Sequence, residues 1–107
     1  MFEADPYHVQ VSPELDEFIH RFVTGGRSEV GPAYSSDEDA ARLVLAKLKD
    51  VTGARVIVGR TRLRDKRWFA RYETDPSDGT EVFAETAELA ICRLALLHAS
   101  KQEAAGG

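Results

Sequence analysis

The sequence lacks most of what common catalytic and metal sites require. Cys92 is its single cysteine, so the chain can form no internal disulfide. The three histidines, His8, His20 and His98, stand apart, without the paired spacing of a zinc site. No glycine-rich phosphate loop occurs. We therefore predict that the protein is not an enzyme and uses neither a cofactor nor a metal.

Long apolar runs and a leader are also missing. No window approaches the roughly eighteen apolar residues of a transmembrane helix. The first ten residues, MFEADPYHVQ, lack the basic start and apolar stretch of a secretory signal. We predict a soluble protein of the cytoplasm, that of the host cell if a phage encodes it, with no membrane contact. One domain should span residues 1–107, with a core over about 12–99 and a flexible tail over about 102–107.

Charge is distributed unevenly along the chain. The sequence has 14 basic and 18 acidic residues, a net charge of -4. Residues 55–72 hold seven of the basic residues and one acid, Asp65, so this segment carries +6 and the remainder carries -10. An anion should therefore be attracted to one region, and general affinity for nucleic acid is not expected.

The first predicted helix begins at Ser12, whose side chain can cap it, with Pro13 in the first turn. Gly25 and Gly26 end it. Its apolar stripe consists of Leu15, Phe18, Ile19, Phe22 and Val23. We interpret its acids, Glu14, Asp16 and Glu17, as a solvated face favoured by the helix dipole, in preference to a catalytic carboxylate pair.

The second predicted helix begins with a capping box. Ser35 would accept from the third helical amide while Glu38 reaches back, and Gly53 would cap the C-terminus. The buried face should consist of Ala41, Val44, Leu45, Leu48 and Val51 or Thr52.

Three strands and a final helix are predicted in the second half. Residues 55–61 and 67–73 should form an antiparallel pair, with a bulge at Gly59 that moves Arg60 and Arg62 off the apolar side. After a turn ending at Gly79, residues 80–84 alternate as a third strand. Thr86 is then expected to cap the longest apolar helix of the chain.

This order, α-α-β-β-β-α, predicts an α/β/α sandwich: a small three-stranded antiparallel sheet with helices on both faces. One face should meet the second and third helices through Trp68, Ala70, Tyr72, Val82 and Ala84. The first helix should cover the other face, which carries Ile57, Phe69 and Phe83.

Several segments together are similar to the phage ABA sandwich domain family, small proteins of phages and prophages. The similar segments are AYSSDEDAARLVLAKL, RWFARYE and FAETAELAICRLALLHA, and the matching residues are Tyr34, Ser35, Leu48, Trp68, Ala84, Thr86, Ala87, Leu89, Ala90, Ile91, Cys92, Arg93, Ala95 and Leu96. The sequence departs from the family pattern at Glu88, where proline is common, and in its arginine-rich strand pair. The resemblance implies an α/β/α sandwich and a phage setting, and it supplies no catalytic residues.

The basic ribbon is the strongest candidate site, consisting of Arg60, Arg62, Arg64, Lys66, Arg67 and Arg71. Arginine forks there could hold phosphates. A strand pair protected from aggregation by charge is the structural alternative, and it stays open. Cys92 lies within an apolar helix, so we interpret it as a structural residue and not as a nucleophile.

Two functions remain open from the residues. The first is a non-catalytic binding protein that sequesters a phosphorylated small molecule or nucleotide, such as a signal of host defence, at the basic ribbon. The second is an interaction module that docks on a host or virion protein through the same ribbon or the acidic first helix. Either function favours a homo-oligomer. Binding of double-stranded RNA is a distant third, because the last helix begins with Ala87, Glu88 and Leu89 where that fold needs lysines.

Overall fold

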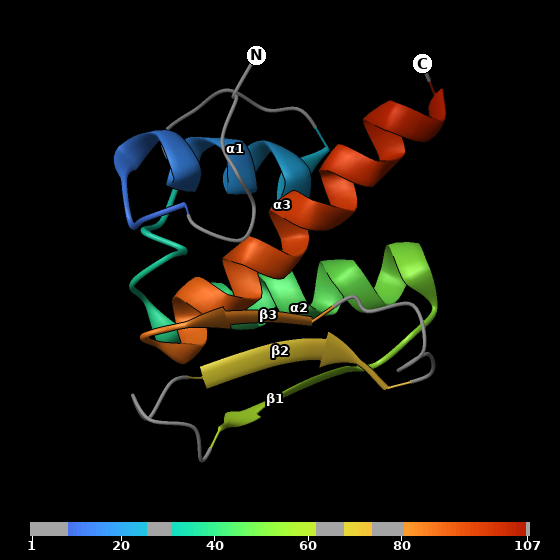
Figure 1. Cartoon of the computed structure of the whole chain (residues 1–107). Coiled ribbons are helices and arrows are strands. Elements are labelled where there is room, and N and C mark those ends of the chain that lie inside the picture. The colour runs from blue at the N-terminus through green and yellow to red at the C-terminus, as the bar shows by residue number, and fades with distance from the viewer. Residues whose placement is uncertain (1–8, 26–30, 62–67, 74–80, 107) are drawn as a thin grey trace.

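The computed structural model describes residues 9–25, 31–61, 68–73 and 81–106, and for residues 100–106 the backbone alone. In chain order the elements are α1 (Pro13–Thr24), α2 (Glu38–Thr52), β1 (Val56–Arg60), β2 (Trp68–Tyr72), β3 (Glu81–Ala84) and α3 (Ala87–Gly106) (Figure 1). This is the predicted α-α-β-β-β-α order, and the α/β sandwich class is confirmed; the predicted placement of helices on both faces of the sheet is not. The predicted turn at Gly79 lies outside the described residues.

Most helix ends follow the capping residues seen in the sequence. Ser12 Oγ accepts from the amide of Leu15 at 3.2 Å and begins α1. Thr86 Oγ1 accepts from the amide of Leu89 at 3.2 Å and begins α3. Gly25 and Gly53 end α1 and α2 at φ values of 82° and 71°, a left-handed conformation that glycine adopts without steric cost.

The predicted start of α2 is wrong. Asp37, not Ser35, is the N-cap, and its Oδ1 accepts from the amides of Asp39 and Ala40 at 2.9 and 3.4 Å. A carboxylate at the cap also complements the helix dipole. Ser35 is fully buried, and its side chain is used in a contact with α1.

The sheet is antiparallel in the order β1-β2-β3, and its register is regular. Gly59 pairs directly with Phe69, so the predicted bulge at Gly59 is wrong. The bulge was expected in order to keep Arg60 away from the apolar side. No bulge is needed, because Arg60 is the last residue of its strand. Its side chain is on the helix-covered side of the sheet but extends past the end of that face into solvent.

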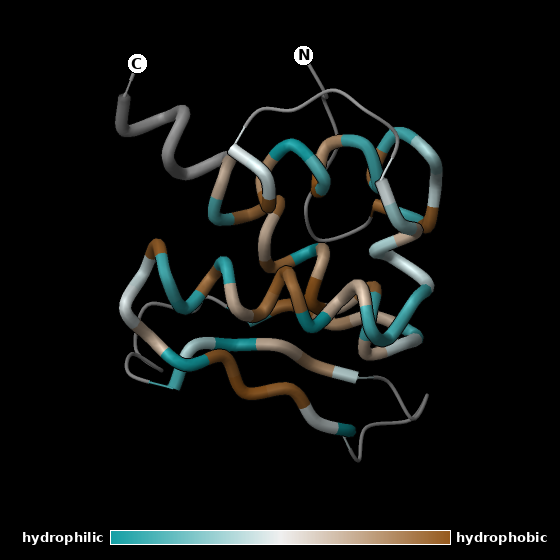
Figure 2. Tube along the Cα trace, turned by 180° about the vertical axis from the view of Figure 1, so that it is seen from behind, coloured by the Kyte–Doolittle hydropathy of each residue, from teal (hydrophilic) through white to brown (hydrophobic). Residues whose placement is uncertain are grey.

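All three helices lie on one side of the sheet. α2 and α3 pack on the face of the sheet that carries Ala70 and Val82. α1 packs on α3 and α2, on the side of α3 that is away from the sheet, as Figures 1 and 2 show from opposite directions. The prediction that α1 covers Ile57, Phe69 and Phe83 is therefore wrong. These side chains are half-buried and lie outside the core cluster, whereas Ala70, Val82 and Ala84 belong to it.

The composition of α3 explains this layering. From Leu89 to Leu97 every side chain of α3 is buried, and all of them except Arg93 are apolar, so the helix presents apolar side chains on nearly its whole circumference. Such a helix must be surrounded, and the sheet, α2 and α1 each cover part of it. Leu15 and Ile19 of α1, both at 0% exposure, enter this core. Among the described residues no helix, α3 included, combines the length and hydrophobicity needed to cross a membrane.

Candidate functional site

The structure places two residues of the basic ribbon, and it places them on opposite faces of the sheet. Arg60 pairs with Trp68 on the face toward the helices. Arg71 pairs with Ile57 and Glu81 on the other face. The other four members, Arg62, Arg64, Lys66 and Arg67, lie outside the described residues. Arg60 and Arg71 therefore cannot hold the same small anion from one side of the sheet.

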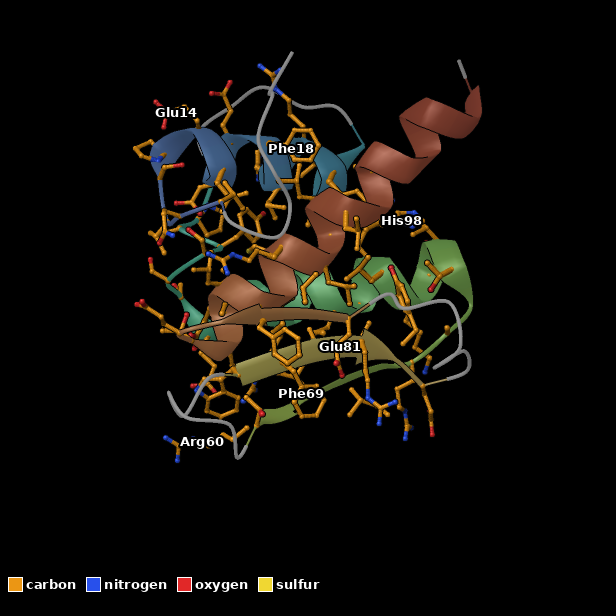
Figure 3. The ribbon with its side chains drawn as sticks, in the orientation of Figure 1. Glu14, Phe18, Arg60, Phe69, Glu81 and His98 are labelled. Carbon is orange, nitrogen blue, oxygen red and sulfur yellow. The ribbon has the colours of Figure 1, made fainter. Side chains whose placement is uncertain are left out.

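Arg60 is exposed and extends away from the body of the molecule (Figure 3). Its guanidinium carbon lies 5.5 Å from the ring centre of Trp68, a cation-π distance. Trp68 is half-buried and packs against the core, so it gives the arginine a fixed platform. A cation-π contact uses none of the N–H donors of the guanidinium in a hydrogen bond, so they remain available for an anion.

Arg71 already has partners within the molecule. Its Nε lies 3.8 Å from Oε2 of Glu81, and its guanidinium lies 5.9 Å from the ring centre of Phe69. The side chains of Arg71 and Glu81 are 35% and 41% exposed, so solvent screens the pair. An acid beside Arg71 disfavours an anionic ligand there.

The sheet face away from the helices combines apolar and charged side chains. We call it the open face; by register it consists of Ile57, Gly59, Phe69, Arg71, Glu81 and Phe83. The Phe69 ring lies close over Gly59, because a Cβ at that glycine would stand 3.1 Å from the ring (Figure 3 labels Phe69). Within the described residues no helix packs on this face.

A buried polar cluster joins α1 to the segment before α2. Asp16 Oδ1 accepts from the amide and the hydroxyl of Ser35, at 2.8 and 2.6 Å. His20 Nδ1 and Tyr34 Oη share a hydrogen bond of 2.9 Å. Asp16 is therefore not part of a solvated acidic face, which corrects that prediction. Asp16 and His20 are four apart and so share one helix face, and Tyr34 and Ser35 are adjacent, but no pattern in the sequence pairs these two segments with each other.

Cys92 lies under this cluster at 0% exposure. Burial raises the pKa of its thiol above the ordinary value, and the charges of Asp16 and Glu88 add to the rise. The pKa of Tyr34 is also raised, by burial and then by Cys92. A thiol held in its protonated form is a poor nucleophile, which fits the structural role expected for Cys92.

Arg93 is a buried cation that the sequence did not single out as a functional residue. Its Nε donates to the carbonyl of Val9 at 2.8 Å, and its Nη1 donates to the carbonyl of Phe83 at 2.6 Å. These bonds tie α3 to β3 and to the segment before α1. Arg93 therefore fastens elements together and is not presented to a ligand.

Comparison with known proteins supports a phage setting. No family model and no curated protein matches the chain. Among solved structures, a phage protein from Bacillus cereus ATCC 14579, determined as a 2.0 Å crystal structure, is similar with a TM-score of 0.64 and 26% sequence identity. The alignment covers 90% of this chain and 96% of that protein. Likeness along nearly the whole of both chains supports a small protein of phage or prophage type.

Proposed function

We propose that this chain is a non-catalytic, phage-type binding protein of the host cytoplasm, which takes a phosphorylated small molecule or nucleotide at the Arg60 end of the β1–β2 pair. The observation that carries the proposal is Arg60 itself, exposed and held in cation-π contact with Trp68. The connection that follows Arg60 in the sequence contributes Arg62, Arg64, Lys66 and Arg67 against one acid, Asp65. On a chain of net charge -4, this end of the sheet is where an anion is attracted.

The proposed site contains fewer residues of the basic ribbon than the sequence predicted. Arg71 is removed from it, because it lies on the opposite face beside Glu81. Trp68 gains a role as the platform that orients Arg60. In this proposal sequestration of a host-defence signal is the use that a phage would make of such a site, and binding needs no chemistry from Cys92.

We further infer membership of the phage ABA sandwich domain family. The residues that carry the resemblance have definite structural roles: Tyr34 and Ser35 join α1, Thr86 caps α3, and Arg93 bonds two backbone carbonyls. Residues that hold a fold together are those that a family sharing it would need.

A matched pair of variants tests the ligand proposal. Mono-, di- and cyclic nucleotides are screened by thermal shift against wild type, Arg60→Gln and Arg71→Gln. A nucleotide should stabilise wild type and Arg71→Gln, while Arg60→Gln should bind at least about tenfold more weakly, since a charge-assisted contact contributes about 1.5–3 kcal/mol when desolvated. Triple replacement of Arg60, Arg62 and Arg67 by Gln should abolish binding with the fold intact.

The same experiment separates the alternative function, docking on a host or virion protein. A panel that leaves the melting temperature of wild type unchanged argues against sequestration and in favour of the interaction module. A partner protein captured equally by wild type and by the triple variant would remove the Arg60 end from both functions. Equal loss of nucleotide binding in Arg60→Gln and Arg71→Gln would contradict the assignment of the site to one face.

A further inference from the structure

The open face has the composition of a protein contact surface. Ile57, Phe69 and Phe83 form its apolar part, contributed by all three strands. Each is half-buried and lies outside the core cluster beneath the helices. Arg71, on the central strand between Ile57 and Glu81, and Glu81 itself add one charge of each sign. Large apolar side chains together with an arginine are a composition found in protein interfaces.

Charge distinguishes this face from the molecule as a whole. The chain carries -4, so two copies repel each other at most orientations. The described side chains of the open face include one arginine and one glutamate, 3.8 Å apart, and their charges cancel. A contact between two open faces therefore adds little to the repulsion between the copies.

The arrangement of the two charges is also complementary to itself. In a two-fold symmetric contact, residue i of one copy meets residue j of the other, and j meets i. Arg71 and Glu81 are direct cross-strand partners on β2 and β3, so such an axis can bring each arginine toward the glutamate of the other copy. The apolar parts then face each other at the separation of about 10 Å that is usual for stacked sheets.

We propose that a second copy of this chain occupies the open face and forms a symmetric, sheet-to-sheet dimer. The inference is independent of the proposed ligand site, because Arg60 lies on the other face. Three strands of at most five residues present about 240 Å² per copy, against about 800 Å² per partner in stable complexes. The dimer should therefore be weak, with a dissociation constant of about 10 µM or more.

Charge reversal in separate copies tests this dimer. Sedimentation equilibrium of the full chain from about 10 µM to about 1 mM should show wild type passing from one chain to two. Arg71→Glu places two acids on the face and Glu81→Arg places two bases, so each variant alone should dimerise at least about tenfold more weakly. An equimolar mixture of the two should regain association, because unlike faces then meet.

Controls distinguish the open face from general charge effects. Arg42 and Glu38 form an exposed pair on α2, 3.6 Å apart, and their reversal, Arg42→Glu or Glu38→Arg, should leave the wild-type dimer unchanged. Ile57→Lys breaks the apolar part while keeping Arg71 and Glu81, and it should yield a monomer; it serves also if a charge variant fails to fold. A monomeric wild type at the highest concentration, a dimer insensitive to these open-face changes, or a mixture that stays monomeric would each overturn the proposal.

Discussion

At the centre of the sheet, the two faces differ in the size of their apolar side chains. The face under the helices has Ala70, Val82 and Ala84 at its centre, none more than 2% exposed. The open face has Ile57, Phe69 and Phe83, all half-buried. Small side chains let α3 approach closely enough to contact all three strands, while large ones shield the backbone of a face that has no helix. Small side chains at the centre of the sheet therefore lie under α3, and large ones lie on the open face.

α1 and α3 differ in how much of their circumference is buried. α1 is amphipathic, and its buried residues Leu15, Ile19 and His20 lie along one side. α3 is buried on every side from Leu89 to Leu97. A helix of the second kind requires more covering surface than a three-stranded sheet provides, and α1 supplies the rest. Because α1 covers α3, it does not cover the second face of the sheet, which stays open.

The largest expected loss of stability comes from a carboxylate placed on the helix-covered face of β2, compared with one placed on the open face at the adjacent residue. Ala70→Asp puts a carboxylate at a position with 0% exposure, and it should lower the free energy of unfolding by at least about 3 kcal/mol or prevent folding. Phe69→Asp leaves its carboxylate hydrated on the open face and should cost about 1–2 kcal/mol of lost apolar burial. Urea unfolding measures both. Equal losses would contradict the distinction between the faces.

Much of the fold follows from local sequence signals. Ser12, Gly25, Gly53 and Thr86 act where their types predict, because a cap depends on atoms within a few residues. Strand pairing also follows from adjacent segments. The side of the sheet to which α1 goes is different, because it depends on the total surface that α3 must bury, and that is a property of the packed molecule.

The candidate site was predictable in composition and not in geometry. Counting charges identified residues 55–72 as the basic segment. The opposite directions of Arg60 and Arg71 depend on register, and the predicted bulge at Gly59 gave a different parity for the residues after it. The contact of Ser35 with Asp16 spans 19 positions in the chain, and no local pattern specifies such a pair.

A smaller effect is expected from adding one methyl group at two glycines. A Cβ at Gly31 would lie 2.2 Å from Nδ1 of His20, a ring that is 7% exposed and bonded to Tyr34. Gly31→Ala should therefore lower the free energy of unfolding by about 1–3 kcal/mol. At Gly59 the Cβ would meet the Phe69 ring at 3.1 Å, but this ring borders solvent and can shift.

Gly59→Ala should accordingly change the free energy of unfolding by about 0.5 kcal/mol or less, since alanine also restricts the unfolded chain. Thermal unfolding of the two variants beside wild type gives the comparison. Gly31→Ala combined with His20→Ala should recover part of the loss, because the smaller side chain makes room. A loss at Gly59 as large as that at Gly31 would mean that Phe69 is held as rigidly as a core residue.

The smallest effect at ordinary pH concerns the proton on Cys92, beneath the helices. Burial raises the pKa of this thiol above its ordinary value of 9.0, so the unfolded chain releases the proton at lower pH than the folded chain. The folded state then binds more protons, and the contribution to stability is complete below about pH 9 and falls as pH rises toward the folded-state pKa. The fall can reach about 1.4 kcal/mol per pH unit. Tyr34, whose pKa is raised from 10.0, adds a second loss that begins about one pH unit higher.

Cys92→Ala removes the thiol's share of this dependence while keeping that of Tyr34. Urea unfolding at pH 7, 9 and 10 should show wild type losing stability on the alkaline side more steeply than Cys92→Ala, even though the variant starts lower because it leaves a small cavity. Labelling of the native thiol by a maleimide should be slow at pH 7 for the same reason, since the buried group is both inaccessible and protonated. Parallel alkaline slopes with rapid labelling would show that Cys92 meets solvent in the folded state. The core beneath the helices would then be accessible to solvent, and it would no longer differ from the open face in this respect.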